Sequence, residues 1–426
     1  MTATEAELRD RLGEIEDPAL DADIVSLGLI DELRVADGVA ELTLEFAAPY
    51  APDEMAMGRQ IREAADELGL EARLSVTLPD RDPGSPIPGV RNVIAVSSGK
   101  GGVGKTTVAT NLAAGLADAG ARVGLFDADI YGPNVPRMVG IEAEPGVTDD
   151  ATLVPPVAYD VTMMSMAFLV PDEEKHDPAM LRGPMIDKLI VELLEDVEWG
   201  RLDYLVVDLP PGTGDAQLTL LQTVPVAGAL IVTTPEDVAL DDVRKGLRIF
   251  SDHDVPILGL VENMSGFHCP DCGGIHDLFG SGGGSEVAEE YDVPLLAEVP
   301  MDPEIRTRND ADGPPAVLGG GPAAEPLSNL VDAVANRVGA VGRASAAGVE
   351  PGEIGLESEE PVGGSSDSPA ERPTGDPTTT GDPTTTGDPT TTGNLEDVDP
   401  TSDAESPAGS TVSGGLDFSE GDGEAD

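Results

Sequence analysis

The 426-residue chain is poor in aromatic and basic residues. Aromatic residues make up 3% of it, so a hydrophobic core has to be built mostly from aliphatic side chains. It holds 24 lysines and arginines against 81 aspartates and glutamates, a formal net charge of −57. A surface this acidic repels phosphate backbones and anionic lipids, so we expect no nucleic-acid and no membrane partner. The charge is typical of halophilic adaptation, in which a salt-rich cytoplasm screens the repulsion between surface carboxylates.

Cysteines and long apolar runs are also scarce. Two cysteines are too few for a disulfide scaffold. No run approaches the roughly 18 apolar residues that a membrane-spanning helix needs. The first eleven residues are polar and acidic, unlike a secretory signal peptide. These absences lead us to expect a cytoplasmic protein.

One glycine-rich stretch carries the clearest functional signal. It matches the Walker A pattern in full at Gly99, Gly104, Lys105 and Thr106. An apolar run over 92–97 predicts a buried strand before it, and the pattern over 108–116 predicts a helix after it. This is the context that a phosphate-binding loop requires. Glycines tolerate the positive φ angles that turn backbone N–H groups toward a phosphate, and the helix N-terminus adds partial positive charge.

We therefore expect this loop to bind ATP together with Mg²⁺. Lys105 would contact the β- and γ-phosphates, and Thr106 would contact the Mg²⁺. The predicted nucleotide-binding residues of the loop are Gly99, Lys100, Gly101, Gly102, Val103, Gly104, Lys105, Thr106 and Thr107.

Two further predicted strands end in aspartate. The run over 123–127 is apolar up to Asp127, and the run over 204–208 has the Walker B form and ends in Asp208. Ligands of doubly wound sheets bind at the carboxyl ends of strands, so Asp127, Asp129 and Asp208 are expected near the γ-phosphate. Asp208 would hold Mg²⁺ through water. The alternative for the aspartates after the first of these strands is a cap on the helix that follows.

The order of these elements predicts an α/β P-loop NTPase with a mostly parallel, doubly wound sheet over residues 91–345. Residues 1–80 predict a small α+β domain with the order helix, strand, strand, helix, strand, and a hairpin turn at Asp37-Gly38. Residues 81–90 are a proline-rich linker. Residues 346–426 contain 20 acidic residues, one basic residue and a short polar repeat, which predicts a disordered acidic tail.

A second lysine inside the loop, Lys100, narrows the class of NTPase. Lys-Gly-Gly-Val-Gly-Lys-Thr resembles the deviant Walker A of dimeric ATPases that include the nitrogenase iron protein, the Min and Par positioning ATPases and the Mrp/ApbC-type iron–sulfur carriers. The resemblance implies a homodimer that closes on ATP. It also implies that Lys100 reaches the partner's ATP, that Asp129 positions the attacking water and that Asp127 supports the Mg²⁺ shell. Lys100, Lys105 and Asp129 are the implied catalytic residues, and Asn263 matches the position that reads adenine.

The two cysteines share one turn, Cys269-Pro-Asp-Cys272-Gly-Gly. Two thiolates are half of the four-sulfur ligand set that iron–sulfur clusters and structural zinc sites usually have. A two-fold-related copy of the chain would supply the other half. On the residues alone, two alternatives to a cluster stand equally: a zinc site, with His268 and His276 as further ligands, or a redox-active pair of cysteines.

The placement of this turn shortly after Asn263 closely resembles the Mrp/ApbC-type ATP-binding carriers. The resemblance implies that Cys269 and Cys272 of two subunits bind a bridging [4Fe–4S] cluster and pass it to apo iron–sulfur proteins. Other iron–sulfur assembly factors would be further partners. The alternatives are a positioning ATPase of the ParA and MinD kind and an ATPase with a structural zinc site.

The leading domain has a resemblance of its own. Its pattern Asp-Pro-x-Leu…Asp-Ile-Val-x-Leu-Gly-Leu-Ile, between Asp17 and Ile30, resembles a small domain found in cytosolic iron–sulfur assembly factors. Members of that family often carry a reactive cysteine in this domain, and this chain has none. We therefore expect the domain to dock proteins rather than to perform thiol or cluster chemistry.

Overall fold

The computed structural model describes residues 3–77, 85–129, 132–141, 143–168, 183–212, 214–280, 282–305 and 315–349. These residues belong to one compact unit. Residues 350–426, most of the predicted acidic tail, lie outside the described residues, as do residues 81–84 of the predicted linker. Within the described parts, no helix combines the length and the apolar character needed to cross a membrane.

The first 77 residues form a three-stranded sheet with two helices. The elements are α1 (Glu5–Leu12), β1 (Glu16–Asp17), β2 (Ala22–Asp23), β3 (Ile30–Ala36), β4 (Val39–Leu44), α2 (Pro52–Glu67) and β5 (Glu71–Val76). β4 lies in the centre, antiparallel to β3 and parallel to β5. Asp37 and Gly38 both have positive φ, 50° and 78°, which suits a tight hairpin turn between β3 and β4. The predicted hairpin is confirmed. The predicted order of helix, strand, strand, helix, strand is met by α1, β3, β4, α2 and β5, and the structure adds the short antiparallel pair β1 and β2, which the sequence did not predict.

The large sheet has nine strands among the described residues. Its order is β10-β11-β7-β12-β6-β13-β14-β15, and β16 also pairs with β14. All neighbours are parallel except the short strands β10 and β15, which pair antiparallel with β11 and β14. The strands are β6 (Val90–Ser98), β7 (Val123–Asp127), β10 (Val157–Ala158), β11 (Val161–Ser165), β12 (Leu202–Asp208), β13 (Val226–Thr233), β14 (Ile257–His268), β15 (Ile275–His276) and β16 (Leu295–Met301).

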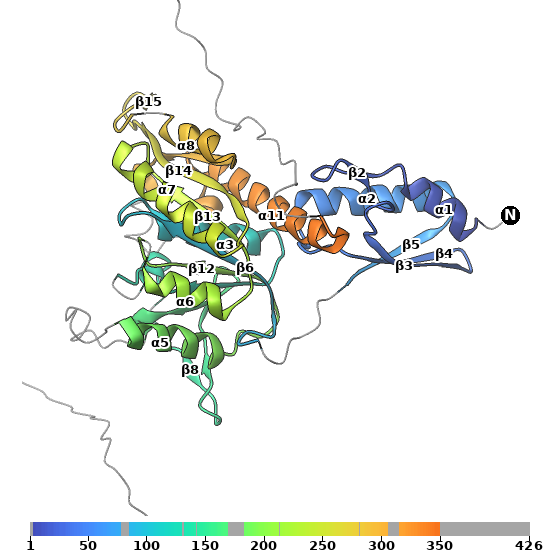
Figure 1. Cartoon of the computed structure of the whole chain (residues 1–426), viewed down its shortest axis with the longest axis horizontal. Helices are drawn as coiled ribbons and strands as arrows, with labels where there is room; N and C mark the ends of the chain where they lie inside the picture. Colours follow the sequence, from blue (N-terminus) through green and yellow to red (C-terminus); the bar gives the residue numbers. More distant parts are fainter. Residues whose placement is uncertain are drawn as a thin grey trace, which may run out of the picture. The chain divides into compact units, whose positions relative to one another are not determined.

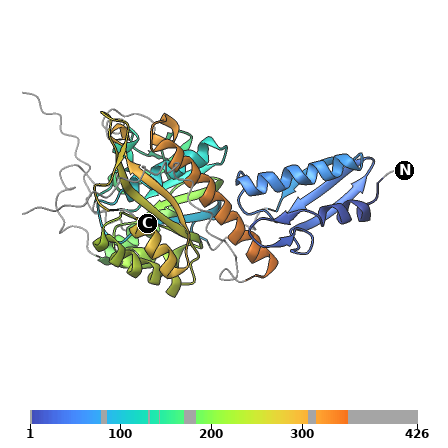
Figure 2. The same cartoon turned by 90° about the horizontal axis from the view of Figure 1, so that it is seen from above.

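Helices cover both faces of this sheet (Figure 1 and Figure 2). The strand residues alternate: Ile94 and Val96 of β6 pack with α3 and α11, whereas Val93 and Ala95 pack in a second core with helices of the other face. The mostly parallel, doubly wound sheet predicted from the sequence is confirmed. The helices are α3 (Lys105–Asp118), α4 (Val135–Met138), α5 (Gly183–Glu195), α6 (Asp215–Thr223), α7 (Asp237–Asp252), α8 (Gly283–Tyr291), α10 (Ala316–Gly319) and α11 (Ala324–Ala347).

The remaining described elements are small. A 3₁₀ turn, η1 (Met166–Phe168), follows β11, and a separate two-stranded hairpin joins β8 (Gly146–Val147) to β9 (Leu153–Val154).

Helix α11 packs against the first 77 residues as well as against the large sheet. A Cβ atom at Gly342 would lie 2.1 Å from the Cβ of Ala47, so only glycine permits this close approach. Directly after Gly342, the fully buried Arg343 forms ion pairs with Asp17 (Nε to Oδ2, 2.6 Å) and with Glu54 (Nη1 to Oε1, 3.0 Å). Burial raises the pKa of Glu54, and the guanidinium of Arg343 opposes that rise.

Replacement of Arg343 by methionine is expected to destabilise the protein by about 3–5 kcal/mol, because two buried carboxylates lose their cation. Without the guanidinium the pKa of Glu54 rises further, and a raised carboxyl pKa favours folding at low pH and opposes it as the pH rises through that value. The deficit should therefore grow between about pH 5 and about pH 8 in urea unfolding curves. Arg9→Met, at an exposed position of α1, is the matched control and should change stability little. An Arg343→Met loss no larger than that of the control would contradict this account.

Candidate functional site

The predicted phosphate loop lies between β6 and α3. Gly102 and Gly104 have φ of 85° and 89°, values that few other residues adopt. A Cβ atom at Gly104 would meet the Nδ2 atom of Asn263 at 2.0 Å, and one at Gly99 would meet the Cβ of Asp242 at 2.3 Å. The loop is therefore held between α7 and β14, and its glycines are required both for their backbone angles and for space.

Lys105 and Thr106, the first residues of α3, both contact Asp208 at the end of β12. The ammonium of Lys105 forms an ion pair with Oδ1 of Asp208. The hydroxyl of Thr106 donates a hydrogen bond to Oδ2, at 2.6 Å. Asp208 is fully buried. The structure thus brings together the lysine, the hydroxyl and the Walker B carboxylate that the sequence placed in one site.

Asp127 lies in register with Asp208 on the neighbouring strand β7. Its Oδ2 accepts hydrogen bonds from the hydroxyl of Ser165 (2.9 Å) and from the backbone N–H of Val135 (3.1 Å), the first residue of α4. Burial, and then the charge of Asp208, raise the pKa of Asp127 to about 7. Asp127 therefore occupies the strand-end position next to the Walker B aspartate and also bonds the start of the following helix, so both sequence interpretations have a structural counterpart.

The donor set at this edge of the sheet suits a Mg²⁺ ion. A hydroxyl from Thr106 and carboxylates from Asp208 and Asp127 are hard oxygen ligands, which Mg²⁺ prefers. A divalent cation would also stabilise two ionised carboxylates that burial otherwise disfavours. Asp129 lies just beyond, and its buried Oδ1 has no hydrogen-bond partner among the described residues. That oxygen is thus available to accept a hydrogen bond from a water molecule.

Lys100, inside the loop, and Asn263, on β14, make further polar contacts at this site. The ammonium of Lys100 pairs with Oε2 of Glu236 at 2.6 Å, and both side chains are partly exposed. The side chain of Asn263 donates a hydrogen bond to the backbone oxygen of Val103, at 2.8 Å. The amide that the resemblance assigned to adenine therefore also holds the phosphate loop.

Sequence reasoning missed two polar residues that support this site. Ser165, at the end of β11, bonds Asp127. Gln217, buried in α6, donates from Nε2 to the backbone oxygens of Gly212 and Pro210 and to the hydroxyl of Ser97. The signal available in the sequence was an amide side chain soon after Asp208, in the first turn of the next helix. From there Gln217 ties the loop that follows Asp208 to β6. Thr213, in the same loop, lies outside the described residues.

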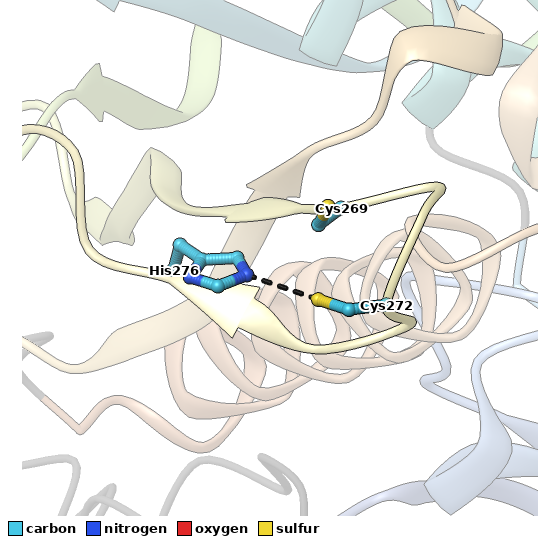
Figure 3. Close-up of side chains that lie close together, drawn as sticks. All are labelled: Cys269, Cys272 and His276. Atoms are coloured by element: carbon cyan, nitrogen blue, oxygen red, sulfur yellow. Dashed lines mark hydrogen bonds between the residues drawn. The ribbon is translucent and has the colours of Figure 1, made fainter.

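The two cysteines lie in a tight hairpin between β14 and β15 (Figure 3). The backbone N–H of Cys269 donates to the oxygen of Gly274 at 3.0 Å, which closes the turn. Sγ of Cys272 lies 3.2 Å from Nε2 of His276, and the ligand atoms of Cys269, Cys272 and His276 all lie within 4.8 Å of one another. Of the two histidines that the sequence left open, the structure brings His276 to the thiols.

Both thiols are accessible, and the surroundings of Cys269 favour its thiolate form. Cys272 is exposed and Cys269 is partly buried. The backbone N–H groups of Cys272 and Asp271 lower the pKa of the Cys269 thiol. Thiolates are the form that binds metal ions and iron–sulfur clusters.

Comparison with known families decides the classification. The family described as NUBPL iron-transfer P-loop NTPases matches residues 89–338, and the family described as iron–sulfur cluster assembly protein matches residues 5–77. The chain belongs to the NUBPL iron-transfer P-loop NTPases. The resemblance to iron–sulfur carrier ATPases that we drew from the sequence is thereby confirmed.

Two relatives of this NUBPL-type NTPase are both described as iron–sulfur cluster carrier proteins. The iron–sulfur cluster carrier protein of Deinococcus radiodurans is 45% identical over 318 residues, which are 72% of this chain and 87% of the relative. That of Synechocystis is 44% identical, over 71% of this chain and 88% of the relative. Among solved structures, an ADP-bound nucleotide-binding protein from Archaeoglobus fulgidus is 39% identical over 52% of this chain and 87% of its own, with a TM-score of 0.46.

Asp127→Asn is expected to remove a pH-dependent loss of stability. The pKa of Asp127 is raised to about 7 in the folded protein, so ionisation of this carboxyl opposes folding. The stability that the neutral carboxyl contributes is fully present below its ordinary unfolded pKa and is lost as the pH rises toward 7. The neutral amide does not titrate. The stability of wild type relative to the variant should fall by about 2–3 kcal/mol between pH 5 and pH 7.

Urea unfolding in EDTA, at fixed high salt, would measure this difference. Asp118→Asn, at an exposed position of α3, controls for the loss of one negative charge. Parallel pH profiles for wild type and Asp127→Asn would show that Asp127 does not titrate in this range.

Proposed function

We propose that this chain is an ATP-hydrolysing carrier that holds a [4Fe–4S] cluster at a dimer interface and passes it to apoproteins. The observation that carries the proposal is the cysteine turn: two accessible thiols, whose sulfur atoms lie within 4.8 Å of each other and of a ring nitrogen of His276, follow the strand that also contacts the phosphate loop. The names of the relatives, iron–sulfur cluster carrier proteins, support the same function.

A shared cluster requires two copies of the chain. One chain offers two thiolates, and a [4Fe–4S] cluster normally has four cysteine ligands. A two-fold axis near the turn brings two such pairs together. Because Cys272 is exposed, an acceptor protein with its own thiols can approach the cargo there. We propose a homodimer, and apo iron–sulfur proteins as recipients.

The two lysines of the nucleotide site already form ion pairs with carboxylates, and ATP would replace those carboxylates as their partners. An arriving triphosphate offers Lys105 an alternative anion to Asp208. Thr106 and, through water, Asp208 would hold Mg²⁺, with Asp127 behind them, and the ion would neutralise charge on the phosphates. Asp129, through its unpaired Oδ1, would orient the attacking water. Lys100 would leave its partly exposed pair with Glu236 to reach the partner's ATP, a change that costs little at an exposed site.

The domain division also belongs to the proposal. We assign residues 1–80 to a domain that docks iron–sulfur assembly factors, 81–90 to a linker, 91–345 to the ATPase domain and 346–426 to a tail. The absence of cysteine before residue 269 supports docking rather than chemistry in the first domain. A salt-rich cytoplasm is the proposed location, on the strength of the net charge of −57.

One observation favours a second candidate function for the thiols. The contact between Cys272 and His276 gives a single chain three ligands of the kinds that zinc binds. A mononuclear zinc site would make the hairpin a structural element of an ATPase.

Anaerobic reconstitution with iron and sulfide tests the carrier. We expect about four irons and about four sulfides per dimer, with absorption near 400 nm, and transfer of the cluster to an apo-enzyme. Cys269→Ala and Cys272→Ala together should abolish both. His276→Ala is the matched control, because four thiolates from two chains suffice for the cluster. Stoichiometric zinc without sulfide, lost in His276→Ala, would replace the carrier by the zinc site.

Lys100→Ala separates nucleotide binding from dimer closure. The variant should bind ATP through Lys105 as wild type does, lose dimerisation induced by a non-hydrolysable ATP analogue, and hydrolyse ATP about 100-fold more slowly. Sedimentation velocity and a phosphate-release assay measure the two effects. Lys188→Ala, exposed on α5, should behave like wild type. Normal dimerisation of Lys100→Ala would contradict the proposed role.

A further inference from the structure

The segment that carries the cysteines lines a cavity beside the phosphate loop with both of its ends. We call residues 264–279 the cysteine hairpin. Its first residue, Met264, and its last, Phe279, line a single cavity of about 120 Å³ with Lys100, Gly101, Gly102 and Val103 of the loop. This cavity therefore lies between the phosphate loop and the cysteine hairpin.

The first end is tightly held. Asn263, immediately before the hairpin, is buried and donates its hydrogen bond to Val103. Gly104 packs so closely against that amide that no Cβ fits between them. Interiors packed this tightly transmit small displacements instead of absorbing them. A shift of the loop must therefore move Asn263.

Beyond Asn263 the pairing of β14 with its neighbour β16 is interrupted, and it resumes at Phe267, which lies opposite Met301. The pairing of β14 with β16 shifts register between Asn263 and Phe267. Met264 has a φ of 61°, which is rare for a residue with a side chain. Such an irregularity bends a strand locally and changes the direction in which it continues. The cysteine hairpin is thus attached to the sheet at a bend.

The two arms of the hairpin are joined to each other at several points. Phe267 and His268 of β14 pair with His276 and Ile275 of β15. Gly266 lies so close to Ile275 that a Cβ atom there would meet its Cγ2 at 2.6 Å. The contact between Cys272 and His276 spans the tip. A push on the returning arm therefore reaches the thiols.

We propose that Phe279 is a positioning residue that couples the bound nucleotide to the geometry of the thiols. Phe279 ends the returning arm, is 39% exposed and faces the cavity beside the loop. Pockets that hold small molecules usually have about 300–1,000 Å³, so a part of the nucleotide that extends past Lys100 into this cavity needs more room than its volume of about 120 Å³ gives. Displacement of Phe279 would provide it and would shift the hairpin. This inference rests on the proposed function, because it assigns a route between that function's two sites.

The test is the effect of nucleotide on cobalt binding. Co²⁺ alone, added anaerobically to the full chain, reports on the thiols through thiolate-to-metal charge-transfer absorption. In wild type, a saturating non-hydrolysable ATP analogue should change the Co²⁺ dissociation constant by about fivefold or more. In Phe279→Ala the change should fall below about twofold, and by reciprocity the effect of Co²⁺ on analogue binding should fall equally. Phe279→Tyr should restore both effects.

Leu278→Ala is the matched control, since Leu278 is the exposed neighbour and does not line the cavity. It should keep the full nucleotide effect. The coupling role is overturned if Phe279→Ala keeps that effect, if Leu278→Ala loses it equally, if wild type lacks it, or if Phe279→Ala no longer binds the analogue. If wild type neither binds cobalt at the thiols nor assembles a cluster, the proposed function fails together with the coupling. If cobalt binding responds to nucleotide and no cluster assembles, the carrier fails and the coupling stands.

Discussion

Two buried carboxylates lie side by side at the carboxyl ends of two neighbouring strands of the large sheet, and the nucleotide site is arranged around them. Asp127 and Asp208 occupy matching positions at the ends of neighbouring parallel strands. Burial disfavours the charge of each, and each repels the other. Lys105, Thr106 and Ser165 lie against them and supply a cation and two hydroxyl donors. Because ionisation of these two buried aspartates opposes folding, binding of an additional cation beside them is strongly favoured.

Sequence reasoning was most successful where the physical cause is local. Glycines at the turns that need positive φ identified the phosphate loop and the Asp37-Gly38 hairpin, and apolar runs gave the central strands. It failed where the cause lies between distant segments. Periodicity does not show that Arg343 pairs with a carboxylate 326 residues earlier, or that Ser165 supports Asp127. Both facts depend on how strands and helices are placed in space.

The cysteine turn shows the same limit within one site. The spacing of Cys269 and Cys272 was visible in the sequence, and so were two flanking histidines. Which histidine meets the thiols depends on the antiparallel register of β14 and β15, which places His276 across the hairpin from Cys272. The strand β14 itself extends to His268, the residue directly before Cys269. That extension is what connects the thiols to the sheet.

The pairing of Arg343 with Asp17 and Glu54 has a consequence for the order in which the protein can be made. Domains generally begin to fold as the chain leaves the ribosome, from the N-terminus onward. Asp17 and Glu54 emerge early, yet the guanidinium that neutralises them belongs to α11, one of the last described segments to be synthesised. The nascent segment of residues 1–77 therefore has to keep these carboxylates hydrated or protonated until α11 arrives. Its final packing is a late event of biosynthesis, although it is the first part of the chain to appear.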